Sequence, residues 1–246
     1  GAYVVGIAAH HGSDNGWLQL LITVGLSAAI GALTGLVSLR TVGVAFIMIT
    51  LAFAQMIYYL VNSIKAYGGD EGLNIKQRSD FGLGLDLKND VTFYFVVLLV
   101  LVVTLVLISR IMHSRFGRVI LAIRDDDVRV DAIGFPSYRY KWVLFVIAGT
   151  LGGLAGALMV NHQNYVSPNL MHWTQSGVLM IMVILGGVGY LWGGLVGAAA
   201  FLLIEEVLVA YTIHWQFGLG AVLLAVVLLS PNGLLSLLGK FRRKPA

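Results

Sequence analysis

The sequence predicts an all-α, polytopic membrane protein: a bundle of about seven spanning helices plus a partial one at the N-terminus. Of its 246 residues, 58% are hydrophobic and only 11% are charged, against roughly a quarter charged in soluble domains. The mean hydropathy is +0.86. The apolar residues also gather into runs long enough to cross a hydrocarbon core about 30 Å thick. We therefore expect one membrane domain over residues 1–246.

Seven apolar runs follow one another along the chain. They cover residues 17–39, 43–61, 91–109, 142–160, 178–190, 195–213 and 217–234. The third is an uninterrupted apolar stretch typical of a spanning helix. Residues 1–9 (GAYVVGIAA) resemble the end of a helix and show no signal-peptide pattern. We therefore expect the chain to lack an N-terminal part.

The stretch 178–213 is too long for one span and is interrupted by glycines. Gly186-Gly187 and the string from Gly189 to Gly194 divide it. We interpret it as two short helices joined by a tight turn. A re-entrant hairpin is the alternative, and it requires surrounding protein or a cavity.

Charge predicts the orientation. Residues 110–141 carry seven basic and four acidic residues, and 240–246 carry four basic residues. Residues 62–90 carry four basic and five acidic ones. Because basic loops stay on the cytoplasmic side, we place 110–141 and the C-terminus in the cytoplasm and 62–90 outside.

Several function classes lack their motifs. The chain has no P-loop, no H-E-x-x-H and no G-x-S-x-G, which argues against nucleotide binding by a P-loop and against the matching hydrolases. It has no cysteine, and its six histidines are irregularly spaced. We predict no catalytic residue, no metal site and no bound cofactor. The isoelectric point near 9.4 reflects membrane-flanking loops, so we expect no nucleic acid partner.

The loop 110–141 contains a candidate docking segment. Residues 118–133 are expected to form a helix that Gly134 ends, with Pro136 shortly beyond. Such a compact charged unit between two spans suits docking onto a soluble partner. An ordinary positive-inside loop is the alternative.

Two polar features lie within apolar runs. Gln55, Tyr59 and Asn62 recur at i, i+4 and i+7 and share a helix face. They are candidates for a translocation path, or for interhelical hydrogen bonds with Tyr59 at the membrane interface. Glu205 is a second path candidate. It and Glu206 point about 100° apart on a helix. The alternative interpretation is that both carboxylates lie near a helix end and are solvated.

Glycine spacing predicts close helix packing, with hinge motion as the alternative. G-x-x-x-G patterns occur at Gly31/Gly35, Gly149/Gly153 and Gly152/Gly156. The positions assigned to packing or hinges are Gly152, Gly156, Gly186, Gly187, Gly189 and Gly193.

Over nearly its whole length the sequence resembles the LivM-type permeases of branched-chain amino-acid ABC importers. The matching stretches, in the family's order, are SLRTVGVAFIMITLAFAQ (38–55), YGGDEGLN (67–74), SRFGRVILAIRDDDVRVDAIG (114–134), YKWVLFVIAGTLGGLAGAL (140–158), SPNLMHWTQSGVLMIMVILGGVGYLWG (167–193) and GAAAFLLIEEVL (197–208). Three departures stand out. Only Gly134 fits the E-A-A-x-x-x-G docking motif, Gly194 stands where the family usually has proline, and the family's further upstream helix is absent.

The resemblance implies an importer permease fold and a loop that docks on an ATPase. The loop residues implied are Arg118, Arg124, Asp125, Asp126, Asp127, Arg129, Asp131 and Gly134. It also implies two ATPase subunits that use the ATP, a related second permease and an extracytoplasmic binding protein, all at a bacterial plasma membrane. Leucine, isoleucine and valine are the implied substrates. Urea, amides or aromatic acids are alternatives within the family, and a stand-alone channel or carrier is a further one.

Overall fold

The computed structural model describes residues 1–12, 15–75, 81, 89–211, 214–229 and 233–234. The chain divides into two compact units, Gly1–His172 and Trp173–Ala246, which are treated one at a time. The predicted basic tail 240–246 and part of the predicted external loop 62–90 lie outside the described residues.

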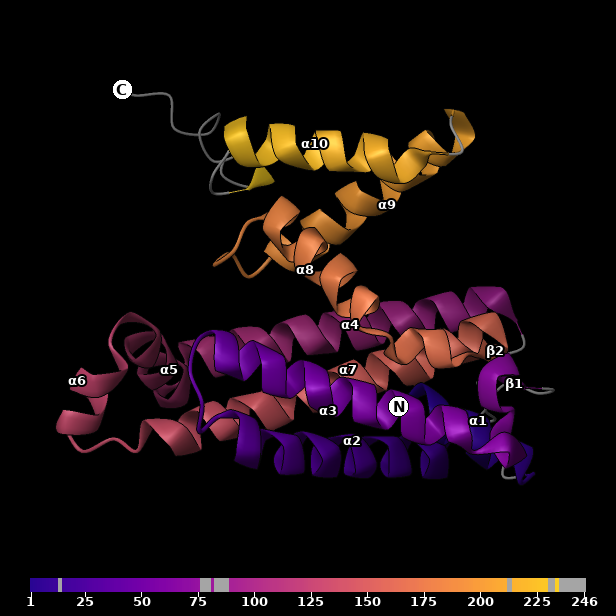
Figure 1. Ribbon diagram of the computed structural model, residues 1–246, viewed down its shortest axis with the longest axis horizontal. Helices are drawn as coiled ribbons and strands as arrows, with labels where there is room; N and C mark the ends of the chain where they lie inside the picture. Colours follow the sequence, from indigo (N-terminus) through magenta and orange to yellow (C-terminus); the bar gives the residue numbers. More distant parts are fainter. Residues whose placement is uncertain (13–14, 76–80, 82–88, 212–213, 230–232, 235–246) are drawn as a thin grey trace. The chain divides into compact units, whose positions relative to one another are not determined.

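Unit 1 contains seven α-helices, several short 3₁₀ turns and one two-stranded ribbon among its described residues (Figure 1). Its elements are α1 (Ala2–His10), α2 (Gly16–Ser38), α3 (Val44–Ser63), η1 (Lys65–Tyr67), η2 (Gly69–Glu71), β1 (Leu73–Asn74), α4 (Asp90–His113), α5 (Arg115–Asp125), α6 (Asp127–Ala132), α7 (Ser137–Gln163), β2 (Tyr165–Val166) and η3 (Pro168–Met171). Unit 2 consists of α8 (Trp173–Gly186), α9 (Gly193–Tyr211) and α10 (Trp215–Leu229).

The all-α membrane architecture is confirmed. Five helices in the described part of the chain are long and apolar enough to cross a membrane: α2, α3, α4, α7 and α9. The helices α8 and α10 stand where the fifth and seventh runs were predicted, but they have 14 and 15 residues. At 1.5 Å per residue they reach about 21–23 Å, short of a core about 30 Å thick.

Asparagine side chains set the start of two spans. Asn15 accepts hydrogen bonds from the backbone N–H groups of Trp17 and Leu18, and Asn89 accepts one from Val91. Such caps satisfy N–H groups that have no partner within the helix. They explain why α2 and α4 begin one residue before the apolar runs.

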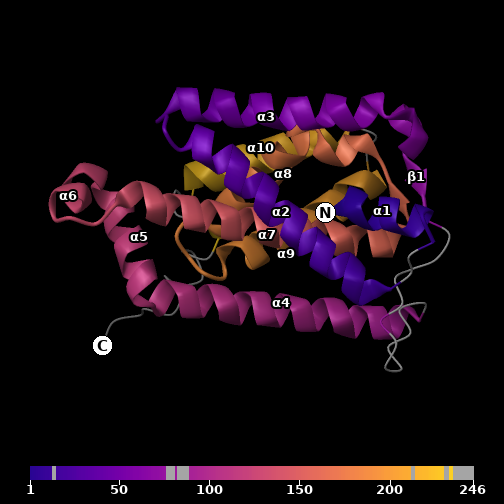
Figure 2. The same cartoon turned by 90° about the horizontal axis from the view of Figure 1, so that it is seen from below.

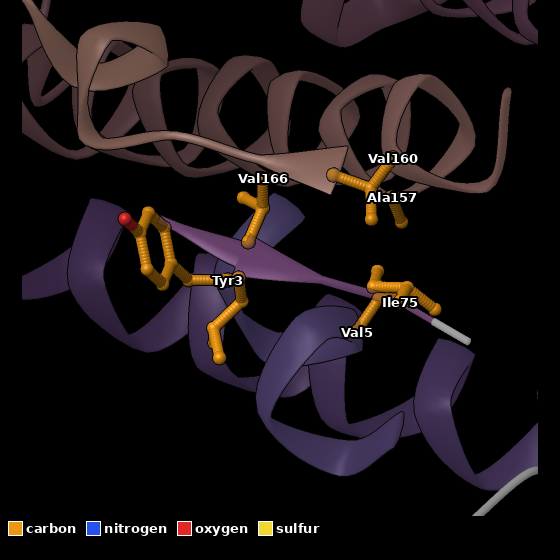
Figure 3. Packing of buried hydrophobic residues seen from close by; sticks show 7 residues of the cluster. Tyr3, Val5, Ile75, Ala157, Val160 and Val166 are labelled. Carbon is orange, nitrogen blue, oxygen red and sulfur yellow. The ribbon is translucent and has the colours of Figure 1, made fainter. Parts of the chain in front are cut away.

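A small core lies where the ribbon meets α1 and the end of α7. Its buried residues are Tyr3, Val5, Leu73, Ile75, Ala157, Val160 and Val166 (Figure 3). The strands pair antiparallel, Leu73 with Val166 and Asn74 with Tyr165. The ribbon joins the segment after α3 to the segment after α7, a contact that the sequence pattern did not predict. We call this the ribbon end of unit 1.

Helices α2 and α7 pack closely through glycines. A Cβ on Gly149 would lie 3.7 Å from the Cα of Gly31, and one on Gly153 would collide with the Ser27 side chain. A Cβ on Gly156 would lie 3.1 Å from the backbone nitrogen of Ala2. Gly152, by contrast, has no atom within 4 Å of that position. Gly153, which was not among the assigned positions, makes the contact in its place.

In unit 2, α8 and α9 form a hairpin. Gly186, Gly193 and Gly197 bring the two backbones so close that a Cβ at any of them would collide with a neighbouring backbone carbonyl. The turn between the helices uses Gly187 and Gly189 at φ 115° and 101°, a conformation that side chains other than glycine rarely adopt. Two helices joined by a glycine turn are thus present in 178–213, an arrangement that the two-helix interpretation and the re-entrant hairpin share.

Candidate functional site

The segment between α4 and α7 forms two helices rather than the one predicted over 118–133. Ser114 caps α5, and its hydroxyl accepts a hydrogen bond from the Gly117 N–H at 3.2 Å. Asp126, at φ −158°, interrupts the helix, and its carboxylate accepts a hydrogen bond from the Arg129 N–H at 3.0 Å. A short side chain that bonds a backbone N–H two or three residues on starts a new helix instead of continuing the old one. The prediction of one continuous helix was wrong at this residue.

The two helices project at the end of unit 1 opposite the ribbon (Figure 2). Ile123 of α5 and Val130 of α6 are buried, whereas the basic residues Arg118, Arg124 and Arg129 are exposed. We call residues 114–136 the elbow. The predicted stop at Gly134 agrees with its φ of 96°.

The elbow is fastened to the first turns of α7. Asp131 accepts hydrogen bonds from the Ser137 N–H and hydroxyl, both at 2.9 Å. Asp127 forms an ion pair with Lys141. The bond to the Ser137 N–H satisfies one of the groups at a helix start that lack a partner within the helix. Two of the predicted docking residues therefore hold the elbow in place.

Aromatic rings add a third attachment. The ring of Tyr140 stacks on Phe116 of α5, with centroids 5.3 Å apart at 29°, and meets Phe135 edge-on at 6.4 Å. Offset stacked and edge-to-face pairs are the favourable arrangements for such rings. Tyr140 thus contacts both ends of the elbow.

The other charged residues of the elbow remain at its surface. Arg124 lies 3.4 Å from Asp125, and Arg129 lies 3.3 Å from Asp126. The Arg129 side chain is 78% exposed, and ion pairs in that setting contribute little to stability. Val128 and Ile133 are 80% and 69% exposed. The elbow therefore presents two aliphatic side chains among charged ones.

Electrostatics favour the charged form of Asp127. Its pKa is lowered, chiefly by the hydrogen bond from the Lys141 ammonium. The carboxylate is therefore ionised at neutral pH, and the pair with Lys141 persists over the physiological range.

Contacts continue from α7 to α2. The Tyr138 hydroxyl donates to the carbonyl of Leu36 at 2.9 Å, and the Trp142 indole donates to the carbonyl of Ala32 at 3.0 Å. The glycine contacts follow farther along the same pair of helices. Side-chain contacts thus link the elbow to α7, and α7 to α2.

The polar stripe on α3 is only partly turned inward. The Gln55 Nε2 and the Asn62 Oδ1 are shielded from solvent and have no hydrogen-bond partner among the described residues. Tyr59 is 65% exposed, with its ring 5.3 Å from that of Tyr58. Glu205 lies on α9 in unit 2 and is partly buried, whereas Glu206 is exposed.

The described residues include no group of three or more His, Cys, Asp or Glu side chains placed to hold a metal ion.

Comparison with known proteins decides the family. A family model described as "branched-chain amino acid transport system / permease component" matches residues 1–229. The chain belongs to this permease family. The resemblance to LivM-type permeases is thereby confirmed, and with five apolar spans in the described part of the sequence the chain is a multi-pass membrane protein.

Individual relatives agree with this membership. The chain is 27% identical over 258 residues to the high-affinity branched-chain amino acid transport system permease protein LivM of Escherichia coli, covering 96% of this chain and 61% of the relative. It is 25% identical over 131 residues to a probable LivM of Methanocaldococcus jannaschii, covering 52% and 37%. A fructose import permease protein, FruG of Bifidobacterium longum, is 23% identical over 209 residues, covering 79% and 60%. The chain thus spans about three fifths of the bacterial relatives' length. No solved structure matches it.

Proposed function

We propose that this chain is the membrane-spanning permease subunit of an ATP-binding-cassette importer for branched-chain amino acids, and that the elbow docks on its ATPase. One observation carries the proposal: the elbow is bonded to α7 through Asp131 and Asp127, while Val128, Arg129 and Ile133 face outward. Exposed aliphatic side chains beside arginine are typical of protein contact surfaces.

The series of contacts gives docking a mechanical consequence. A displacement of α6 pulls on Ser137 and Lys141 in the first two turns of α7. Because Tyr138 and Trp142 bond to carbonyls of α2, α2 moves with α7. Packed elements transmit such shifts as units because closely packed interiors deform little.

The remaining partners follow from the family. Two ATPase subunits bind and hydrolyse the ATP, so that this chain holds no cofactor and performs no chemistry on its substrate. A related second permease completes the membrane part, and an extracytoplasmic binding protein delivers the substrate. The elbow and the C-terminus lie on the cytoplasmic side of a bacterial plasma membrane, which the excess of basic residues in 110–141 supports.

Gln55 and Asn62 are the proposed path residues of α3. Their shielded polar atoms without partners are costly in a static helix bundle. Contact with a polar solute in transit provides a reason to keep them. Glu205 is the corresponding candidate of unit 2, and Tyr59, at 65% exposed, is the weakest of the four.

The substrate is the least determined part of the proposal. The LivM relatives carry names for branched-chain amino acids, whereas FruG is named for fructose import. Competition decides this point: excess leucine, isoleucine or valine should abolish uptake of labelled leucine in proteoliposomes, and excess fructose, urea or phenylalanine should not.

Docking is tested by ATPase retention. The protein, co-expressed with its ATPase partners, is purified through a tag on the permease, and the retained ATPase is measured. Val128→Asp should lose the ATPase. Val42→Asp is the matched control, because Val42 is equally exposed, at 78%, in the loop after α2 at the same end of unit 1.

Two results would overturn the docking proposal. If Val128→Asp holds as much ATPase as Val42→Asp, the elbow is not the docking surface. If wild type retains none, while the protein alone lets leucine equilibrate across liposomes, a channel or carrier replaces the importer.

A further inference from the structure

Helix α4 is poorly packed within its own unit. It has 24 residues, and Phe93 is the only one buried. A cavity of about 670 Å³ lies between α4 and α7, and a second of about 630 Å³ lies on another side of α4, toward α1 and α2. The first, which we call the α4–α7 crevice, is lined among the described residues by these two helices alone.

The crevice is apolar along its length and polar at its ends. On α4 its lining runs from Asp90 to Thr104, and on α7 from Leu151 to His162. Asp90 and His162 both stand at the ribbon end, where the His162 ring stacks on Phe93 with centroids 5.8 Å apart at 9°. Between the ends the described lining is aliphatic or aromatic.

The length of the crevice matches one leaflet. From Asp90 to Thr104 helix α4 rises about 21 Å at 1.5 Å per residue. Its apolar part, from Phe93 to Thr104, rises about 16 Å, close to half of a hydrocarbon core about 30 Å thick. The crevice thus begins at the polar end of α4 and stops near the middle of a span. A transmembrane helix of another subunit, by contrast, would cross the whole bilayer and would need a groove along both halves of α4.

The chemistry of the lining selects the occupant. An amino acid carries an ammonium and a carboxylate, and burying these without partners is costly. Water needs two to four polar partners, whereas apolar cavities stay dry and accept apolar molecules. Around a spanning helix, the apolar molecule present is lipid.

We propose that the α4–α7 crevice binds one acyl chain of a membrane phospholipid, with the headgroup at the Asp90 end. The chain fills the space between two helices that touch little of each other and supports α4 in its place. This site is separate from the transport proposal, since it requires only that α4 and α7 span a bilayer.

Photo-crosslinking tests the site. The full chain is placed in nanodiscs of phosphatidylethanolamine and phosphatidylglycerol that contain a phospholipid with a diazirine in its acyl chain, irradiated, digested and mapped by mass spectrometry. Cross-links should be denser on crevice residues such as Val97 and Leu158, where a chain is held, than at Val102, which is 51% exposed on α4, lines neither cavity and meets only exchanging lipid.

Matched variants decide the interpretation. Ala155 is an exposed residue of the crevice wall. The variant Ala155→Phe should abolish the crevice cross-links, whereas Val102→Phe should leave them unchanged. If Ala155→Phe fails to fold, Leu151→Phe fills the crevice from its other end. Equal labelling at Val97 and Val102, or crevice cross-links that persist in the filled variant, would overturn the proposal.

Discussion

Both carboxylate oxygens of Asp131 bond to one residue, Ser137: one accepts from its backbone N–H and the other from its hydroxyl, each at 2.9 Å. This pair attaches the last turn of α6 to the first turn of α7 across the bend that contains Gly134. Asp131 therefore joins the elbow to α7 and also satisfies a backbone N–H at the start of a span.

Asp131→Ala should uncouple ATP hydrolysis from transport. Losing a cap costs about 1 kcal/mol of stability, and the exposed docking side chains remain, so the ATPase should still bind. Uptake and phosphate release, measured in parallel in proteoliposomes, should show less substrate moved per ATP. Ser137→Ala, which keeps the N–H bond, should lose less. An unchanged ratio in Asp131→Ala would remove this residue from the coupling route.

The Asp127–Lys141 pair should strengthen the same attachment at every physiological pH. Lys141 lowers the pKa of Asp127, so the stabilisation is present above the ordinary carboxyl pKa of about 3.9 and is lost only as the pH falls through the lower value of the folded state. Both side chains are about a third exposed, which limits the coupling energy to about 1 kcal/mol or less.

A double-mutant cycle checks this second attachment. Thermal unfolding of Asp127→Asn, Lys141→Met and the double variant should show non-additive losses that are the same at pH 5 and pH 8. A coupling energy that changes between these two pH values would mean that another titrating group controls the pair.

The long spans were predictable from the sequence, and the elbow was predictable only in part. Runs of apolar residues determine α2, α3, α4 and α7 almost unaided, because only a helix satisfies the backbone in lipid within a single segment. Asp126 was grouped with its acidic neighbours as a docking residue. The hydrogen bond that its carboxylate accepts from the Arg129 N–H depends on the local backbone conformation, which the amino-acid composition of the loop does not reveal. The ribbon of β1 and β2 pairs residues about ninety positions apart, and no local pattern predicts such a contact.

Glycine spacing in α7 is a second case in which the sequence does not identify the contact. The pattern offered both Gly149/Gly153 and Gly152/Gly156 as packing pairs, because it cannot tell which face of α7 meets α2. In the structure, Gly149 and Gly153 face α2 and Gly156 faces α1, whereas Gly152 faces open space. A helix face becomes identifiable only when its partner is placed.

Gly152 and Gly153 are adjacent in α7 and provide a matched stability test. Gly153→Ala should lower the unfolding temperature, because its new methyl collides with Ser27 of α2. Gly152→Ala should leave it unchanged or raise it, since alanine favours a helix over glycine by about 1 kcal/mol. Unfolding in one detergent, followed by light scattering, measures both. Equal effects at the two positions would contradict the described packing of α2 on α7.

Replacing the shielded amides of α3 should affect protein stability and transport in opposite directions. Gln55→Leu and Asn62→Leu each remove a polar atom that lacks a partner among the described residues, and leaving such a group buried costs about 1–3 kcal/mol. We therefore expect equal or higher unfolding temperatures together with slower uptake of labelled leucine. Tyr59→Phe, at an exposed position, should change neither. Slower uptake with a lower unfolding temperature would instead indicate structural hydrogen bonds, and full uptake in both leucine variants would place the path elsewhere, because a polar solute would then cross without these amides.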